Sequence, residues 1–311
     1  MTQLKGILPA LVTPFDKAGN VDHDMLSNII EFQLKAGVKG FVPLGSTGEY
    51  YALTNQERRQ VLATVREVVG DRGVLIAGAN GSCTREVIEQ VKQTQDAGYT
   101  NLLIAPPYYA LPSQEELIGH YQAILDAAPD INVVLYNYPV RTNVEVGFGV
   151  LEAFKDHKRV IGIKESSGNL LRAIEIGGTY KDHYQLSCGS DDQALDFFLW
   201  GATSWICGPA NCLTQQVCDF YTKYSSADLA GAQAISRSLF PVLADMESGK
   251  FIQKVKYGCE LAGFEAGHAR MPPSVWPAKV VARYAVGSRS LVRLRTKIEA
   301  VQPPSASRTP K

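Results

Sequence analysis

The run KRVIGIKESSGN, residues 158–169, contains the side chain with the clearest capacity for chemistry, Lys164. Residues 160–163 suit a buried strand, and the lysine follows them directly. An amine held in a low-dielectric pocket loses its charge more easily, because desolvation disfavours the ammonium form. A neutral lysine amine attacks a ketone carbonyl and forms a Schiff base. The alternative is an ordinary lysine that reaches solvent at the end of a strand.

Two further segments carry polar side chains that suit such a site. Tyr136 lies in the apolar segment LYNYP, and Arg141 follows that segment. The tyrosine is either a site group or a packing residue with a satisfied hydroxyl. The arginine either pairs with a substrate carboxylate or forms a surface ion pair. The segment GSTGE contains Ser46 and Thr47, and its backbone N–H groups can hold a carboxylate, although ordinary loops have the same composition.

The composition excludes several classes of partner. The 311 residues include 31 basic and 31 acidic side chains, so there is no electrostatic case for nucleic acid or an anionic membrane surface. No run reaches about 18 uninterrupted apolar residues, so no membrane span is expected. The N-terminal run MTQLKGILPALVTPF predicts a first strand and not a signal peptide.

The cysteines and histidines favour neither disulfides nor a metal site. No pair of cysteines forms C-x-x-C, and in a chain this long the pattern predicts reduced, buried thiols and a cytoplasmic location. No histidine has a partner at i, i+4, so metal-assisted hydrolysis has no support. We expect no metal and no cofactor. The cysteines are Cys83, Cys188, Cys207, Cys212, Cys218 and Cys259, and the histidines are His23, His120, His157, His183 and His268.

The elements that must position these residues alternate regularly. Helical spacing of apolar residues fills the gaps between strand-like runs, and Ser113 and Thr54 mark helix starts. Eight strands alternating with helices predict an α/β fold, the (β/α)₈ TIM barrel. A doubly wound sheet is the alternative, but no G-x-G-x-x-G follows the first strand. The runs are GILPALV (6–12), GFVPLG (40–45), VLIAGA (74–79), NLLIAPP (101–107), NVVLYNYP (132–139), VIGIKES (160–166), YQLSCGS (184–190) and TSWICGPA (203–210).

The sequence pattern changes at about Ser226, where the alternation of strand-like and helical segments gives way to helical segments. Helical periodicity continues over 229–246, 251–263 and 282–300, which predicts a helical extension packed on the barrel. The end of the chain has a disordered composition. The expected units are a catalytic barrel (1–225), a C-terminal helical region (226–300) and a disordered tail (301–311).

In a TIM barrel the active groups cluster where the strands end, at their carboxyl edges. Side chains along a strand alternate between its two faces, so Tyr136 lies on the same face as Val134, which we expect to be the lumen face. Strict alternation also puts Ile161 and Ile163 on the face opposite to Lys164. The seventh and eighth strands end in Gly189-Ser190 and Ile206-Cys207-Gly208, which we expect to close the pocket.

The chain resembles the dihydrodipicolinate synthase / N-acetylneuraminate lyase family over about residues 4–300. The resemblance implies a (β/α)₈ barrel with a C-terminal helical region, usually a homotetramer built as a dimer of dimers. It also implies a lysine Schiff base with pyruvate or a related small 2-oxo acid. The motifs that carry it are GSTGE (45–49), PPYYALPSQEEL (106–117), YNYPVRT (136–142), GIKESSGN (162–169) and CGSDDQALDF (188–197).

The same resemblance implies a role for each matched residue. Lys164 forms the Schiff base, and Tyr136 relays protons together with the hydroxyls of Ser46 or Thr47. The backbone amides of those two residues hold the substrate carboxylate. Tyr109, the second tyrosine of the YY pair, reaches the site of the neighbouring subunit.

The remaining matches and the departures concern the substrate. Arg141 matches the arginine that steadies the second substrate's carboxylate at the site mouth in the synthases, and Gly189 and Ile206 match pocket-lining positions. The departures are Asn143 after Arg-Thr, Tyr50 and Tyr51 after GSTGE, and SGKFIQKVK (248–256) where synthases tend to have Asn-Pro-Ile-Pro-Val-Lys. They put feedback inhibition by lysine in doubt.

The first expectation for function is a 4-hydroxy-tetrahydrodipicolinate synthase-type aldol condensation of pyruvate with aspartate semialdehyde. The departures also suit catabolic relatives with the same lysine, such as 1-pyrroline-4-hydroxy-2-carboxylate deaminase or a 2-keto-3-deoxy sugar acid dehydratase or aldolase.

Two hypotheses come from other classes. A phosphate-binding barrel enzyme is disfavoured by Asp191 and Asp192, which we expect to cap the following helix. A non-catalytic barrel that binds a 2-oxo acid needs neither Lys164 nor Tyr136.

Overall fold

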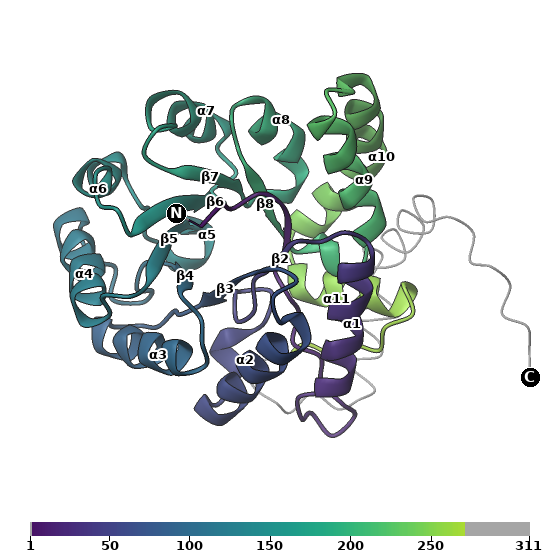
Figure 1. Ribbon diagram of the computed structural model, residues 1–311, viewed down its shortest axis with the longest axis horizontal. Helices are drawn as coiled ribbons and strands as arrows, with labels where there is room; N and C mark the ends of the chain where they lie inside the picture. Colours follow the sequence, from purple (N-terminus) through teal and green to yellow (C-terminus); the bar gives the residue numbers. More distant parts are fainter. Residues whose placement is uncertain (1, 271–311) are drawn as a thin grey trace, which may run out of the picture.

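A computed structural model of the protein describes residues 2–270. Its centre is a ring of parallel strands with helices around it (Figure 1). The strands follow the order β1-β8-β7-β6-β5-β4-β3-β2, and a parallel bridge between Ala10 and Val42 joins β1 to β2. The predicted (β/α)₈ barrel is therefore confirmed. Its strands are β1 (Gly6–Pro9), β2 (Gly40–Phe41), β3 (Val74–Gly78), β4 (Asn101–Ile104), β5 (Asn132–Asn137), β6 (Val160–Glu165), β7 (Gln185–Cys188) and β8 (Ser204–Cys207).

The helices begin where the capping residues predict. Thr54 and Ser113 each form a complete capping box with the glutamate three residues later, Glu57 and Glu116. The α-helices are α1 (His23–Lys35), α2 (Asn55–Val69), α3 (Thr84–Asp96), α4 (Gln114–Ala127), α5 (Pro139–Thr142), α6 (Phe148–Phe154), α7 (Leu170–Thr179), α8 (Ala194–Leu199), α9 (Thr214–Ser225), α10 (Leu229–Glu247) and α11 (Phe251–Leu261). The 3₁₀ turns are η1 (Tyr50–Ala52), η2 (Asp191–Gln193) and η3 (Pro209–Asn211).

The barrel lumen is a packed core that ends beneath the candidate site. Side chains such as Leu8, Val42 and Ile76 fill it, and a second cluster packs between the strands and the outer helices. Val134 and Tyr136 both belong to the lumen cluster, as alternation predicted.

The predicted orientation of Ile161 was wrong. Its side chain lies in the lumen cluster, whereas Ile163 packs outside. The cause is a β-bulge: Val133 pairs with Val160 and Val134 pairs with Gly162, so one extra residue of β6 interrupts the alternation.

Beyond the barrel, α10 and α11 follow the predicted helical runs and pack on it. The helix α10 contacts α9 and η2, and α11 contacts η3. The helix expected over 282–300 and the tail over 301–311 lie outside the described residues. Of the described helices, none has the length and the apolar composition that crossing a bilayer requires.

The described cysteines form no disulfide, and four of them are buried. The expectation of burial was wrong for Cys83, which is exposed. Its place explains this, because it is the cap residue before the first turn of α3, at the surface.

Candidate active site

Lys164 lies at the carboxyl end of β6 with its side chain buried in the barrel mouth. It is 6% exposed, and its Nζ lies 4.5 Å from the centroid of the Tyr136 ring. The two residues are register partners on β5 and β6. Within residues 2–270, Lys164 forms no ion pair. Burial lowers the pKa of its amine, although the Asp191 carboxylate opposes that shift, so the neutral, nucleophilic form becomes more accessible.

Tyr136 connects the lysine to the loop after β2. Its side chain is 4% exposed. Burial raises the pKa of the phenol, while a hydrogen bond with Ser46 partly offsets the shift. The ring also stacks on Tyr138, with centroids 5.7 Å apart. A phenol that stays protonated and contacts a hydroxyl suits proton transfer beside the lysine amine.

The loop that carries Ser46 and Thr47 turns tightly beside this tyrosine. The N–H groups of Gly48 and Glu49 donate to the carbonyls of Gly45 and Ser46, at 3.0 and 3.1 Å. A side chain at Gly48 would place its Cβ 2.9 Å from the Leu11 carbonyl oxygen, so the turn requires glycine there. Within the described part of the chain, the N–H groups of Ser46 and Thr47 have no acceptor, which leaves two donors for an anionic ligand.

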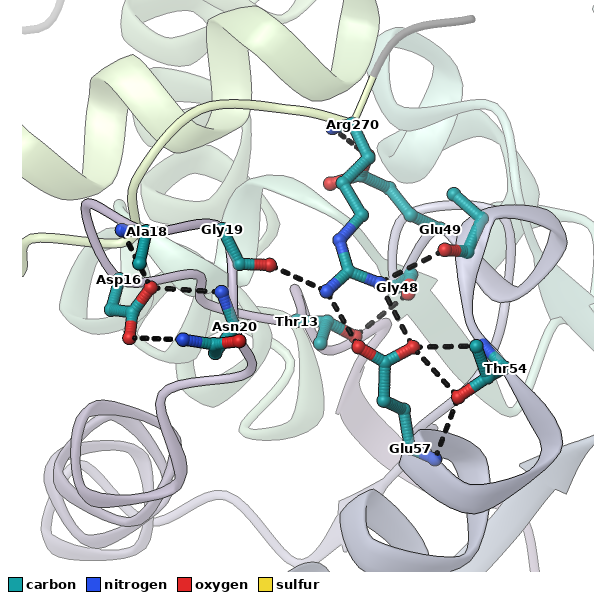
Figure 2. Close-up of polar contacts among 11 residues, drawn as sticks. Thr13, Asp16, Ala18, Gly19, Asn20, Gly48, Glu49, Thr54, Glu57 and Arg270 are labelled. Atoms are coloured by element: carbon teal, nitrogen blue, oxygen red, sulfur yellow. Dashed lines mark hydrogen bonds and ion pairs between the residues drawn. The ribbon is translucent and has the colours of Figure 1, made fainter. Parts of the chain in front are cut away.

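Two contacts hold this loop from the outside: an ion pair between Glu49 and Lys256, and the contacts of Arg270 with Glu49 and Glu57, which Figure 2 shows. Glu49 is fully buried in a left-handed conformation with φ 54°, and its carboxylate pairs with Lys256 of α11 at 2.8 Å. The backbone N–H of Arg270 donates to the other Glu49 oxygen at 2.7 Å. The Arg270 guanidinium donates to both oxygens of Glu57, at 2.6 and 3.0 Å. The helical extension therefore helps to position the loop of Ser46.

The end of β7 leaves space for the lysine. A Cβ at Gly189 would clash with Oγ of Ser166 and would lie 2.8 Å from Cε of Lys164 and 2.9 Å from the Glu165 carbonyl oxygen. Only glycine fits that position without moving the amine. Ile206 of β8 is 1% exposed and belongs to the lumen cluster below.

Arg141 and Tyr109 lie further out. Arg141 belongs to the short helix α5 and is exposed, with its guanidinium carbon 5.9 Å from the centroid of Tyr138. Tyr109 is 94% exposed with φ 73°, so within one chain it does not join the cluster around Lys164. Its contact with a neighbouring subunit stays a prediction.

The capping role expected of Asp192 and Asp191 was wrong, because neither is the N-cap of a helix after β7, and Asp191 has another partner. Its carboxylate is buried and accepts a hydrogen bond from Trp205 Nε1 at 2.7 Å. The N-caps of η2 and α8 are Ser190 and Gln193, and neither receives a side-chain capping bond. Burial and the nearby Glu247 raise the pKa of Asp191 well above its ordinary value. An acidic pair therefore lies close to the lysine.

Sequence reasoning missed three acidic or aromatic residues of the site region. Glu165 lies in β6 and is fully buried, where it accepts from Asn137 Nδ2 at 2.8 Å and from Arg172 Nε at 3.2 Å. That network fixes the strand end behind Lys164. Glu247 and Phe251 come from the helical extension. Phe251 lies in SGKFIQKVK (248–256), whose departure from the synthase pattern was a signal, whereas Glu247 precedes that segment and had none.

No group of three or more histidine, cysteine or carboxylate side chains is arranged to hold a metal ion in residues 2–270. The site is thus a buried amine, a phenol, hydroxyls and free backbone donors at the mouth of a barrel.

Comparison with known proteins places the chain in a family. The model of the dihydrodipicolinate synthetase family matches residues 3–280. The chain belongs to this family. It is 33% identical over 282 residues to the 4-hydroxy-tetrahydrodipicolinate synthase of Phenylobacterium zucineum, covering 91% of this chain and 95% of that one. It is 34% identical over 271 residues to the synthase of Methanoculleus marisnigri, covering 86% and 92%.

The family also accounts for the fold. The chloride-inhibited dihydrodipicolinate synthase of Acinetobacter baumannii, complexed with pyruvate, superposes with a TM-score of 0.88 at 26% identity, covering 96% of this chain and 99% of that one. The synthase of Aquifex aeolicus superposes with a TM-score of 0.85 at 25% identity, covering 95% and 97%. Members of this enzyme family named as synthases are lyases that act on small molecules.

Proposed function

We propose that this member of the dihydrodipicolinate synthetase family is a lyase that forms a Schiff base between Lys164 and pyruvate or a related small 2-oxo acid. The observation that carries the proposal is the buried amine of Lys164, 4.5 Å from the Tyr136 ring and without an ion-pair partner in residues 2–270. The related synthase that binds pyruvate supports the choice of ligand.

The chemistry follows from the groups around the amine. The Lys164 nitrogen attacks the keto carbon, and the oxygen leaves as water. The protonated imine then withdraws electrons, so a proton leaves the adjacent methyl carbon and an enamine forms. Tyr136 is placed to transfer protons in these steps, which contributes on the order of 10²–10⁴-fold. The free N–H groups of Ser46 and Thr47 orient the substrate carboxylate.

The first candidate reaction is the condensation of this enamine with aspartate semialdehyde, in which the enamine carbon attacks the aldehyde carbon. Relatives that are 33–34% identical carry the synthase name. Arg141 at the mouth suits the carboxylate of the incoming aldehyde. The homotetramer implied by the family, with Tyr109 entering the neighbouring site, belongs to the same proposal.

The second candidate is a catabolic reaction of the same Schiff base, such as deamination of 1-pyrroline-4-hydroxy-2-carboxylate. It is favoured by residues 248–256, which form the turn after α10 and the first part of α11 and depart from the synthase pattern.

Trapping the imine tests the proposal. The protein is incubated with pyruvate, reduced with borohydride and digested, and mass spectrometry should find the adduct on Lys164. Lys164→Arg should lose the adduct, whereas Lys158→Arg, a matched change at an exposed lysine before β6, should retain it. Absence of an adduct with pyruvate and with several other 2-oxo acids would refute the Schiff-base reaction. A panel of aspartate semialdehyde plus pyruvate against hydroxylated pyrroline carboxylates then separates the two candidates.

A further inference from the structure

The loop from Leu44 to Glu49 is held in an unusual backbone shape. The residues at its two ends, Leu44 and Glu49, have positive φ angles of 57° and 54°. A residue with a side chain rarely adopts this left-handed conformation, because its Cβ crowds the following carbonyl oxygen, so the conformation persists only where the surroundings enforce it. Between these ends lie Ser46 and Thr47, whose N–H groups have no acceptor within residues 2–270. The strain therefore falls on the loop that carries the donors for the substrate carboxylate.

A buried ion pair holds one end of this loop. The carboxylate of Glu49 lies 2.8 Å from Nζ of Lys256, and the two side chains are 0% and 2% exposed. Burial raises the pKa of Glu49 and lowers that of Lys256, so both charges lose hydration. Their mutual attraction returns this cost only in part, so stability is a weak explanation for such a pair. A pair of this kind can instead fix one conformation of the loop that carries it.

Segments that follow the barrel hold the pair in turn. The Lys256 amine also lies 4.0 Å from the centroid of the Phe15 ring. The backbone N–H of Arg270 donates at 2.7 Å to the Glu49 oxygen that does not contact Lys256 (Figure 2). The guanidinium of Arg270 donates to the carbonyl of Ala52 at 3.0 Å, just after the loop. Both oxygens of the glutamate are thus held, and the loop cannot turn without breaking these contacts.

We propose that the Glu49–Lys256 pair positions the N–H groups that bind the substrate carboxylate, with Arg270 as its support. The pair thereby makes the protein selective for 2-oxo acids over neutral ketones. The inference rests on the proposed Schiff-base function. The pair acts through the turn, because the N–H of Glu49 donates to the Ser46 carbonyl at 3.1 Å and so sets the orientation of the peptide between Ser46 and Thr47. Hydrogen bonds weaken steeply when they are misdirected, so a small rotation of the loop weakens carboxylate binding.

A double variant and two probes test the proposal. Glu49→Gln combined with Lys256→Met removes both charges and nearly keeps both volumes, so the barrel should stay folded. Hydroxyacetone is pyruvate with a hydroxymethyl group in place of the carboxylate, whereas lactate keeps the carboxylate and has no carbonyl to attack.

In the double variant, the adduct of pyruvate that borohydride traps should form about 10- to 100-fold more slowly, the range for hydrogen bonds to a charged group. The Ki of lactate, as a competitor of pyruvate, should rise by the same factor. Adduct formation with hydroxyacetone should be nearly unchanged, whereas a general disturbance of the lysine pocket would slow it too. Glu260→Gln combined with Lys92→Met makes the same changes at exposed residues of α11 and α3, and it should alter none of the three values.

Three results would overturn the inference: lactate does not compete with pyruvate on the unaltered protein, its Ki is unchanged in the double variant, or hydroxyacetone slows as much as pyruvate. If hydroxyacetone forms no adduct on the unaltered protein, the Ki of lactate decides alone. If the double variant does not fold, Arg270→Met replaces it; the Ki of lactate should again rise, and an unchanged Ki refutes the positioning role. In each of these cases a pyruvate adduct on the unaltered protein leaves the Schiff-base function standing. Absence of that adduct means that the Schiff-base function itself fails.

Discussion

Replacing Gly189 by alanine should disable the lysine while leaving the barrel folded. The added Cβ would clash with Oγ of Ser166, which hydrogen-bonds to Tyr136, and would lie 2.8 Å from Cε of Lys164 and 2.9 Å from the Glu165 carbonyl oxygen, so the serine hydroxyl and the lysine must both move. Carbon atoms in contact prefer about 3.5–4.0 Å, so the lysine must retreat by roughly 1 Å. The carbonyl oxygen cannot move as easily, because it accepts the Gly189 N–H at 2.9 Å between neighbouring strands.

The size of the effect follows from that displacement. A misplacement of about 1 Å in a reacting group costs on the order of 10²-fold in rate. We therefore expect Gly189→Ala to form the pyruvate adduct on Lys164 about 100-fold more slowly. The cost in stability should be about 1–3 kcal/mol, as for other overpacked sites.

The assay combines stopped borohydride trapping with urea unfolding. Gly178→Ala in α7 is the matched control, because an added Cβ there meets nothing within 4 Å. It should keep the rate of adduct formation and gain about 0.5–1 kcal/mol from the better helix former. If Gly189→Ala formed the adduct at the unaltered rate, the placement of the Lys164 side chain against β7 would be wrong.

Three further changes test other parts of the site. Tyr136→Phe keeps the ring beneath the amine and removes the hydroxyl, so we expect turnover to fall by about 10²–10⁴-fold in steady-state assays, and unchanged turnover would contradict a proton-transfer role. Glu57→Gln removes the carboxylate that pairs with Arg270. In the unaltered protein, Arg270 lowers the pKa of Glu57 from 4.5 to about 2. The pair therefore stabilises the fold above about pH 4.5 and loses this effect as the pH falls toward 2. The shift corresponds to about 3 kcal/mol at most, and partial exposure reduces the expected loss at pH 7 to about 1–2 kcal/mol in urea unfolding, with no difference from the unaltered protein below pH 2. Lys256→Met leaves the carboxylate of Glu49 buried without the amine that pairs with it at 2.8 Å, so the free energy of unfolding should fall by about 3–5 kcal/mol. Adding Glu49→Gln to this variant should restore part of that loss. An equal loss in the double variant would argue against the pair.

Local patterns in the sequence predicted the barrel well. Each of the eight apolar runs became a strand, because a strand buried on both faces needs a continuous apolar stretch between turns. The capping boxes at Thr54 and Ser113 also formed, since their hydrogen bonds join residues only three positions apart.

The tertiary structure alone decided the details of the pocket. The bulge at Ile161 depends on pairing with β5, and Gly189 matters because Lys164 of the neighbouring strand occupies the space beside it. Glu247 and Phe251 come from helices far along the chain, where neither residue differs from an ordinary helix-end residue in sequence.

The sequence by itself determined which residues stand at the ends of the strands, and the parallel barrel brings those ends to one mouth. It did not determine which later segments cover that mouth, because contacts between distant elements depend on packing angles and side-chain fit that no local period encodes. Lys164 and Tyr136 could therefore be placed from the strand pattern. The contact of Glu247 with the loop after β7 and the Glu49–Lys256 pair exist only because the helical extension packs against the barrel.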